Sequence, residues 1–382
     1  MADGEPIKIG SVLTIKNPAW SNGAVEEVID AWVEHVNSEG GIDGRPLEYE
    51  ACDDEGDPGR SLQCAQDLID SGVVAFVGNQ SLAFGANALP TVEEAKIPNV
   101  GGYPITPAEY QSEYNFPTIA GASGSYPSLA VYLASAGARS LYYVGADTPS
   151  SRSVSDNMSA LWPTLGGEKF DVIYYDATAA DFSPLLAQVA NAKPDGLLCG
   201  CAEGPAPRMY GGIDLVGFGD TIITGTSQGA TQAVFDTAGD AMKGVIFSFP
   251  TVPPTLEGNE EVDRFNAIVD EYAPDVERGA TALTAASSIQ YLVDVLASID
   301  GEITSASLFD ALQEPPVKPF LVHSLAPENA PEGMPRLWNP YNAIVQFDGK
   351  GLVLIGEDAK ESDYVSKEAG VTWFTGNKPA GK

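Results

Sequence analysis

The order of strand-like and helix-like segments constrains the fold of this chain more than any other feature. Residues 7–13 (IKIGSVL) have a strand pattern, and residues 24–36 follow with apolar residues at helical spacing: Val25, Val28, Ile29, Trp32, Val33 and Val36. Residues 73–77 (VVAFV) are short and fully apolar, as expected of a strand buried in a parallel sheet. The opening segments therefore predict alternating β and α units.

The alternation continues in two runs, separated by a Gly/Ser/Pro-rich passage at residues 121–127. The expected strands are 7–13, 45–52, 73–77, 98–100, 141–145, 169–175, 195–200, 221–225 and 244–249. The expected helices between them are 24–36, 58–69, 82–95, 152–165, 181–191, 205–217 and 229–239. Two runs of this kind predict an α/β protein with two doubly wound parallel sheets.

The last third of the chain has too few alternating elements for a third domain. We expect helices at 260–272, 279–299 and 304–313 and strands at 342–348 and 351–355, which complete the two lobes. The predicted N-terminal lobe is 1–121 plus 250–330, and the predicted C-terminal lobe is 122–249 plus 331–382. Such an arrangement predicts two or three crossings between the lobes, with a hinge and a cleft.

Charge and hydropathy exclude some classes of function. The chain carries 53 acidic and 20 basic residues, a net charge of −33, which opposes binding to nucleic-acid phosphates. No run of about 18 apolar residues is present, so we expect no segment that spans a membrane. Acidic Asp3 and Glu5 follow Met1 and Ala2, and we interpret this start as the result of leader removal.

The chain has four cysteines, an even count that suits an oxidising compartment. Cys52 ends an alternating strand segment and Cys64 lies early in the next helix, so we predict a disulfide between them. Cys199 and Cys201 share a face at a strand end, where a flat strand would hold them too far apart. A turn at Gly200 would allow a bond, but we favour two buried thiols.

Candidate binding residues follow from the topology. In open α/β sheets, ligands bind beyond the carboxyl ends of the strands. The loops after the expected strands are 16–23, 78–85, 101–107, 146–152, 199–205 and 225–232. The first of these loops, KNPAWSNG, contains Trp20, a large apolar side chain in a segment otherwise composed of turn residues. Trp20 is either a ligand contact or a residue packed under its own loop.

The chain resembles the branched-chain amino-acid-binding (Leu/Ile/Val) family of type I solute-binding proteins of ABC importers. The segments that carry the resemblance are IKIGSVL, NSEGGIDGRPLE, DDEGDPGRSLQCAQDLI, VAFVGNQS, EEAKIPNV, DFSPLLAQV and AGDAMKGV. The resemblance implies two Rossmann-like lobes joined by three crossings, which close on a small ligand. It also implies an extracytoplasmic protein, periplasmic or lipid-anchored, with ABC transporter permease subunits as partners and no cofactor. We expect a monomer.

In amino-acid-binding members of the family, near-lobe hydroxyls and N–H groups hold the α-carboxylate, and a far-lobe acid pairs with the ammonium. The near-lobe positions of this chain that correspond to ligand contacts are Trp20, Ser81, Leu82, Gly102, Tyr103, Ile105 and Thr106. Ser81 and Leu82 compete for the usual hydroxyl position. Tyr103 and Ile105 occupy positions where small or hydroxyl residues are usual.

The far lobe departs further from the family pattern. The position of the acid corresponds to Ser227 or Gln228, neither of which is charged, and the usual aromatic corresponds to Ala202, with Glu203 beside it. A buried ammonium without a charge partner is costly, so unless Glu203 substitutes, the ligand need not be an α-amino acid.

Aromatic and basic residues suggest another ligand. Trp20, Phe84, Tyr103 and Tyr126 would line an aromatic pocket, and Arg152 would hold a carboxylate. The expected ligand is an amino acid or an aromatic or apolar carboxylic acid. Each residue also has a structural interpretation: Phe84 as a helix core residue, Arg152 as a solvated helix start and Tyr126 as a packing residue.

Three features of the sequence suggest alternatives to an importer's binding protein. GTSQG at 225–229 matches the G-x-S-x-G motif of hydrolases and would use Ser227 with His323, but the motif is short and the protein is predicted not to be an enzyme. A ligand-sensing receptor domain would have the same fold. DDEGD at 53–57 lacks the register of a calcium loop, so we predict no metal site there and interpret it as an acidic turn at a helix start.

Overall fold

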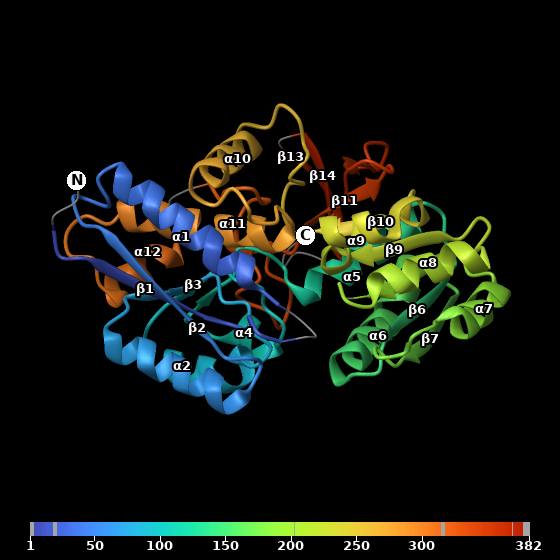
Figure 1. Cartoon of the computed structure of the whole chain (residues 1–382), viewed down its shortest axis with the longest axis horizontal. Coiled ribbons are helices and arrows are strands. Elements are labelled where there is room, and N and C mark those ends of the chain that lie inside the picture. Colours follow the sequence, from blue (N-terminus) through green and yellow to red (C-terminus); the bar gives the residue numbers. More distant parts are fainter. Residues whose placement is uncertain (1–3, 18–20, 202, 315–317, 369, 377–382) are drawn as a thin grey trace. The chain divides into compact units, whose positions relative to one another are not determined.

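The chain folds into two compact units (Figure 1). The computed structural model describes residues 4–17, 21–201, 203–314, 318–368 and 370–376. The first unit contains the described residues up to 122 and residues 257–340, and the second contains residues 123–256 and 341–376. Residues 250–256 and 331–340 thus lie in the opposite unit from the one expected.

Hydrogen bonds account for both reassigned segments. The backbone N–H of Arg336 donates to the carbonyl of Tyr110 (3.1 Å), and Asn339 Nδ2 donates to the carbonyl of Thr118 (2.9 Å), both in the first unit. Thr255 Oγ1 donates to the carbonyl of Leu352 in the second unit (2.6 Å).

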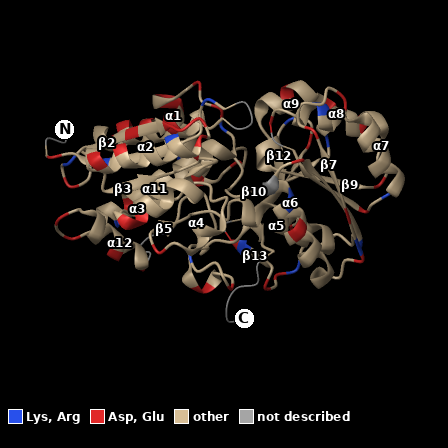
Figure 2. Cartoon of the chain, turned by 90° about the horizontal axis from the view of Figure 1, so that it is seen from below, with Lys and Arg blue, Asp and Glu red and all other residues tan. Residues whose placement is uncertain are grey.

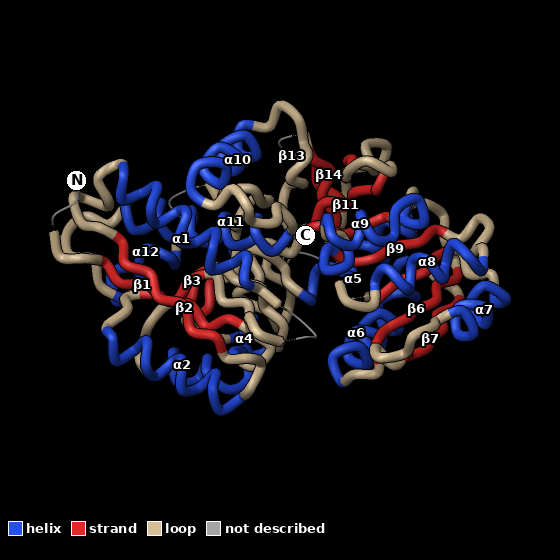
Figure 3. Tube along the Cα trace, viewed as in Figure 1, coloured by secondary structure: helices blue, strands red, loops and turns tan. Residues whose placement is uncertain are grey.

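The first unit is built on a parallel sheet with strand order β2-β1-β3-β4-β5, of which β1, β2 and β3 are labelled in Figure 3. Its strands are β1 (Ile7–Leu13), β2 (Leu47–Asp53), β3 (Ala75–Val77), β4 (Asn99–Val100) and β5 (Asn115–Phe116). Its helices are α1 (Gly23–Ser38), α2 (Pro58–Ser71), η1 (Phe84–Ala88), α3 (Leu89–Glu94), α4 (Pro107–Gln111), α10 (Glu260–Tyr272), α11 (Ala280–Ala297), α12 (Ser305–Gln313) and η5 (Pro327–Asn329).

Local sequence signals place these helices. Asp57 caps α2 by accepting a hydrogen bond from the N–H of Arg60 (2.9 Å), and Pro58 occupies the first helical position, where no N–H is needed. The apolar stripe of α1 packs against α10 and α11, and the ring of Trp32 lies 6.1 Å from that of Phe265.

Helix α11 is long and apolar enough to cross a membrane by length and composition, with a mean hydropathy of 1.2. Of that segment, 78% is buried inside the protein. A buried core helix has this composition too, and α11 packs against α1 and α12.

The second unit has the same order of parallel strands, β7-β6-β8-β9-β10. Antiparallel strands extend this sheet beyond β10. The strands are β6 (Ser140–Ala146), β7 (Lys169–Tyr175), β8 (Gly196–Gly200), β9 (Ile222–Thr226), β10 (Ile246–Phe249), β11 (Asn342–Phe347), β12 (Leu352–Leu354), β13 (Val365–Glu368) and β14 (Val371–Phe374). The helices are α5 (Ala122–Ser135), α6 (Pro149–Leu161), η2 (Trp162–Leu165), α7 (Ser183–Ala192), α8 (Ala206–Val216), η3 (Ser227–Gly229), α9 (Gln232–Ala238) and η4 (Gly239–Met242).

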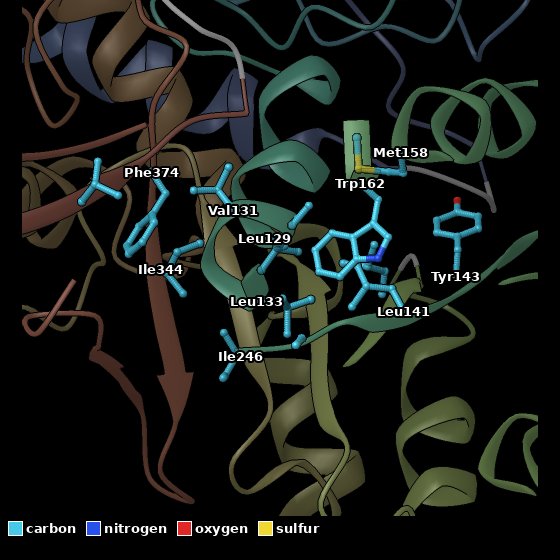
Figure 4. Close-up of a cluster of buried hydrophobic side chains, with 14 residues drawn as sticks. Leu129, Val131, Leu133, Leu141, Tyr143, Met158, Trp162, Ile246, Ile344 and Phe374 are labelled. Carbon is cyan, nitrogen blue, oxygen red and sulfur yellow. The ribbon is translucent and has the colours of Figure 1, made fainter. Parts of the chain in front are cut away.

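The main core of the second unit lies where α5 and α6 meet the sheet (Figure 4). Leu133 from α5, Trp162 after α6 and Leu141 from β6 are buried there together. Ile344 and Phe374 bring the late strands β11 and β14 into the same cluster. The C-terminal strands therefore belong to this core although they follow the parallel strands by about a hundred residues.

The structure corrects several expected elements. Strands β5, β13 and β14 and the short helix α4 were not expected, and the single helix expected at 82–95 is a π-helical turn, η1, followed by α3. Helix α5 was not expected either; it begins within the Gly/Ser/Pro-rich passage, and Pro127 lies inside the helix, where it supplies no N–H. Acidic residues are distributed over both units (Figure 2).

Candidate functional site

The topology of the first sheet directs attention to the point between β1 and β3. The connection after β1 leads to β2 on one side of the sheet, and the connection after β3 leads to β4 on the other side. Open α/β sheets bind ligands at the point where the strand order reverses in this way. The loop after β1 is tied to the loop after β3, since the N–H of Thr14 (3.0 Å) and Asn22 Nδ2 (3.1 Å) both donate to the carbonyl of Gln80. Trp20, the candidate in this loop, lies outside the described residues.

Ser81 and Leu82, the two competitors for the hydroxyl position, have different environments. Ser81 is buried; its Oγ donates to the Asp54 carboxylate and accepts from the N–H groups of Ala83 (3.0 Å) and Phe84 (2.9 Å). The hydrogen-bonding capacity of Ser81 is thus used within the protein. Leu82 is 44% exposed, an uncommon state for a large apolar side chain beside a buried polar network.

Phe84 is a core residue. Its side chain is buried with Leu68 and Ala88 in the apolar cluster beneath α2, and its ring centroid lies 6.2 Å from that of Phe76. The expectation that Phe84 lines an aromatic pocket does not fit this position, because apolar contacts in the core surround the ring.

The loop after β4 is held by close backbone contacts. Gly102 has a φ of +81°, its N–H donates to Ser288 Oγ (3.0 Å), and an added Cβ would lie 2.3 Å from the carbonyl oxygen of Asn79. The N–H of Tyr103 donates to that same carbonyl (3.0 Å), and the Tyr103 side chain is partly buried. Gly102 therefore shapes this loop through its lack of a side chain.

A buried carboxylate holds the end of the same loop. Glu109 Oε2 accepts from the N–H of Ile105 (2.9 Å), the N–H of Thr106 (2.7 Å) and Thr106 Oγ1 (2.9 Å). Burial raises the pKa of Glu109, and these hydrogen bonds partly offset that rise. The Thr106 hydroxyl is thus engaged at the start of α4, whereas the Ile105 side chain stays partly exposed.

The corresponding edge of the second sheet lies between β6 and β8. Tyr126, on α5, is partly buried with its ring in edge contact with Tyr143 of β6, at 5.9 Å. Arg152 is exposed, pairs with Asp147 (2.5 Å) and lies over the ring of Tyr174 (4.3 Å). Both partners of Arg152 belong to the second unit. These contacts agree with the interpretation of Arg152 as a solvated residue at a helix start.

The loops after β8 and β9 carry the remaining candidates. Ala202 lies outside the described residues, and exposed Glu203 accepts from Thr231 Oγ1 (3.4 Å) at the start of α9. Ser227 is buried, and its Oγ has no hydrogen-bond partner within the described chain. Gln228, next to it, is partly buried. A buried hydroxyl without a partner is uncommon, so Ser227 Oγ calls for a partner that the described chain does not supply, such as a water molecule or a polar group of a ligand.

Sequence reasoning missed the tyrosines beneath this edge. The hydroxyl of Tyr210 is also unpaired within the described chain, and an added Cβ on Gly225 would lie 2.2 Å from it. Burial raises the pKa of Tyr210, as it does for Tyr175 of β7. Gly225 of β9 leaves room for the Tyr210 phenol of α8, a relation that depends on how α8 packs on the sheet.

The cysteine predictions divide into one that agrees with the structure and one that does not. Cys52 is bonded to Cys64, with their Cα atoms 5.6 Å apart. Cys199 is bonded to Cys201, so the preference for two thiols was wrong. The chain leaves β8 at Gly200, which brings the two Cα atoms to 5.3 Å, whereas a flat strand would separate them by about 6.6 Å.

The alternative sites receive no support from the geometry. His323 Nδ1 shares a hydrogen bond with neighbouring Ser324 Oγ (3.1 Å), and Ser227 Oγ has no hydrogen-bond partner among the described residues. Among the residues that the structure describes, no group of three or more His, Cys, Asp or Glu side chains is arranged to hold a metal ion. The acidic turn at 53–57 instead caps α2 and binds neighbouring loops.

Comparisons with known proteins agree with the fold. Residues 6–327 match the sequence model of the family described as periplasmic binding protein. A possible leucine/isoleucine/valine-binding protein from Rhodopirellula baltica is similar in structure, with a TM-score of 0.76, 16% identity, and coverage of 95% of this chain and 99% of that one.

Two further solved structures show the same architecture. An ABC transporter substrate-binding protein from Sphaerobacter thermophilus has a TM-score of 0.75 and 20% identity, covering 92% of this chain and 97% of that one. A leucine-binding protein from Thermotoga maritima has a TM-score of 0.71 and 15% identity, covering 92% and 98%. At these identities the likeness establishes the α/β fold of two lobes with parallel sheets that we predicted.

Proposed function

Because this chain belongs to the periplasmic binding protein family, we propose that it binds a small carboxylate-bearing ligand with an apolar body and delivers it to an ABC importer. The family and its structural relatives are solute-binding proteins rather than enzymes, in agreement with the prediction from sequence. The proposed ligand is an amino acid or an aromatic or apolar carboxylic acid.

The exposed side chain of Leu82 is the observation that carries this proposal. It lies at the carboxyl edge of the first sheet, directly after a serine whose hydroxyl is already engaged. The partly exposed side chains of Tyr103 and Ile105 follow the next strand in the same sheet. An edge with these side chains favours an apolar group on the ligand, because contact would remove apolar surface from water.

The second unit supports a ligand without a strongly basic group. Ser227 and Gln228 occupy the expected position of the acid, and the unpaired hydroxyl of Ser227 offers a neutral hydrogen bond. Glu203 is the remaining acidic candidate, and its carboxylate is exposed beside Thr231. A neutral partner at Ser227 suits a hydroxyl, carbonyl or carboxyl group better than an ammonium.

The proposed setting is extracytoplasmic, with transporter permease subunits as partners and a monomeric chain. Family membership supports the compartment, and the two disulfides agree with an oxidising environment. Genes for a permease and an ATPase beside the gene for this chain would support the importer role.

A ligand screen tests the proposal. We expect the melting temperature to rise with L-leucine, L-phenylalanine or phenylacetate, because a ligand held at a hundred times its Kd stabilises the folded state by about 2.7 kcal/mol. Leu82→Ala removes three carbon atoms from the contact, so calorimetry should show affinity about tenfold weaker for the compound that binds.

Leu215 provides the matched control for Leu82. It is 79% exposed near the end of α8, a helix that leads away from the carboxyl end of β8, so Leu215→Ala should leave affinity unchanged. A response only to glucose or putrescine would contradict the proposed ligand class. Binding of L-glutamate alone would show that the argument from the missing acid is wrong.

A further inference from the structure

Asp54 lies directly after β2 at the carboxyl edge of the first sheet, and none of its surface is exposed. Its carboxylate accepts hydrogen bonds from three segments: Thr14 Oγ1 (2.7 Å), the N–H of Gly56 (2.8 Å) and Ser81 Oγ. These donors follow β1, β2 and β3, respectively. One buried side chain therefore connects the loops of three adjacent strands.

The two hydroxyl groups bound to Asp54 also support the next part of the chain. Thr14 Oγ1 accepts from the N–H of Leu82 (3.1 Å), and Ser81 Oγ accepts from the N–H groups of Ala83 and Phe84. A hydroxyl has one proton, and a carboxylate can only accept. Asp54 thus directs both protons towards itself and leaves the oxygen lone pairs for the backbone of residues 82–84.

Gly56 completes the arrangement around Leu82. Its φ of +77° is a conformation that glycine adopts readily, and an added Cβ would lie 3.5 Å from Leu82 Cδ1. Asp54 thus supports the backbone of Leu82 through Thr14, and through the N–H of Gly56 it fixes the turn beside the Leu82 side chain.

We propose that Asp54 is the positioning residue of the ligand-binding edge of the first unit, and that it acts by presenting Leu82 to the ligand. The statement about the ligand rests on the proposed function, whereas the statement about residues 82–84 does not. Asp54 touches no ligand in this proposal; it determines where an apolar contact is placed.

Amide hydrogen exchange of Asp54→Asn tests the local part. The amide nitrogen of Asn faces Ser81 Oγ, whose lone pairs already accept from Ala83 and Phe84, so the link from Ser81 is lost. We expect exchange protection at residues 82–84 to fall about tenfold or more, because hydrogen bonds to charged groups are the stronger ones. Protection of Phe76 and Leu68, in the core of the unit, should remain.

Asp53→Asn is the matched control. Asp53 Oδ1 accepts from the N–H groups of Ile15, Lys16 and Glu55, and none of these contacts involves residues 82–84. We expect this variant to lower protection at residues 15, 16 and 55 only. Equal loss at 82–84 in both variants, or no loss in Asp54→Asn, would overturn the proposal.

A second pair of variants keeps the test decisive if Asp54→Asn does not fold. Thr14→Val removes the hydroxyl between Asp54 and Leu82, and Thr14→Ser retains it. Protection of the Leu82 amide should fall in the valine variant and recover in the serine variant. Unchanged protection in the valine variant would count against the proposal.

Binding of phenylacetate separates positioning from general destabilisation. If Asp54 acts through Leu82, Asp54→Asn should weaken binding about tenfold in the wild-type background and have little further effect in Leu82→Ala. Additive losses would contradict positioning through Leu82. If phenylacetate and both amino acids fail to bind, the proposed function fails, and the exchange experiments still decide the role of Asp54.

Discussion

The two units share a strand order but stabilise their carboxyl-edge loops differently. In the first unit, buried Asp54 and Glu109 accept hydrogen bonds from several loop donors each. In the second unit, phenol hydroxyls lie against strand glycines, as Tyr210 does at Gly225, and a disulfide closes the turn after β8. One edge is organised by ionisable acceptors and the other by shape and a covalent bond.

This difference has a consequence for the ligand. The carboxylates of Asp54 and Glu109 accept hydrogen bonds from the protein itself. We therefore expect the first unit to contact the ligand through apolar side chains such as Leu82. The second unit leaves the Ser227 hydroxyl unpaired within the described chain and so retains hydrogen-bonding capacity. The same topology thus supports an apolar edge in one unit and a polar, uncharged edge in the other.

Glycine substitutions should show the largest difference between the units. Gly101 has a φ of +73°, and an added Cβ would lie 2.0 Å from Ser288 Oγ and 2.8 Å from Ser288 Cα. Gly101→Ala should therefore lower the free energy of unfolding by about 4 kcal/mol, from backbone strain and overpacking together. Gly225→Ala should cost about 2 kcal/mol, since the added methyl group meets the Tyr210 hydroxyl.

Urea denaturation followed by circular dichroism measures both effects. Tyr210→Phe removes the hydroxyl that the added methyl group meets and should recover part of the loss in Gly225→Ala. Gly211→Ala, in α8 with no neighbour within 4 Å of the added Cβ, should stabilise by about 1 kcal/mol. A neutral Gly101→Ala would refute the close packing of β4 on α11.

The disulfides should differ in their contribution to stability. Cys52 and Cys64 are separated by 12 residues and Cys199 and Cys201 by 2. Loop-closure entropy predicts a loss of about 3 kcal/mol for the double serine variant of the first pair and about 1.5 kcal/mol for the second. Thermal denaturation of both variants, with and without reductant, tests this order. The reverse order would show that native-state packing, not loop closure, dominates.

A smaller effect is expected on α1, where three acidic residues share one helical face. Partial burial, followed by the charges of Glu26 and Glu34, raises the pKa of Asp30 from 3.8 to about 6. Since protonation then favours the folded state, the stability contributed by Asp30 is present below pH 3.8 and is lost as the pH rises through about 6. Asp30→Asn should therefore stabilise above pH 6 by about 0.5 kcal/mol, because Asp30 remains exposed to water.

Stability measured at pH 4 and pH 7 checks this expectation. The gain from Asp30→Asn should disappear at the lower pH. Asp214→Asn on α8 is the control in the second unit, because its helix places no acidic residue four positions away on either side. A gain of equal size at both pH values would rule out the carboxylate cluster as its cause.

Local patterns in the sequence were sufficient for most of the elements. The helix at 260–272 and the strands at 7–13 and 169–175 match the structure residue for residue, because apolar periodicity and caps specify them locally. Strands β13 and β14 were missed because they are short and depend on pairing with β11 and with each other. Helix α5 was missed because its first turns have the composition of a loop.

The candidate site could be predicted only as a set of loops. Family motifs and strand order placed Leu82, Tyr103, Ile105 and Ser227 after the correct strands. Phe84 faces the core, and that orientation depends on the π-helical turn at 84–88, which spacing alone does not indicate. Asp54 was interpreted as part of an acidic helix start because its partners lie 40 and 27 residues away.

The sequence by itself determined the fold class and the family, because hydrophobic periodicity, turn residues and motifs are properties of neighbouring residues. Tertiary structure decided which polar groups are already satisfied: Ser81 and Thr106 are engaged, while Ser227 is buried without a partner in the described chain. That division depends on which loops the folded chain brings within hydrogen-bonding distance. It decides which residues remain available to a ligand.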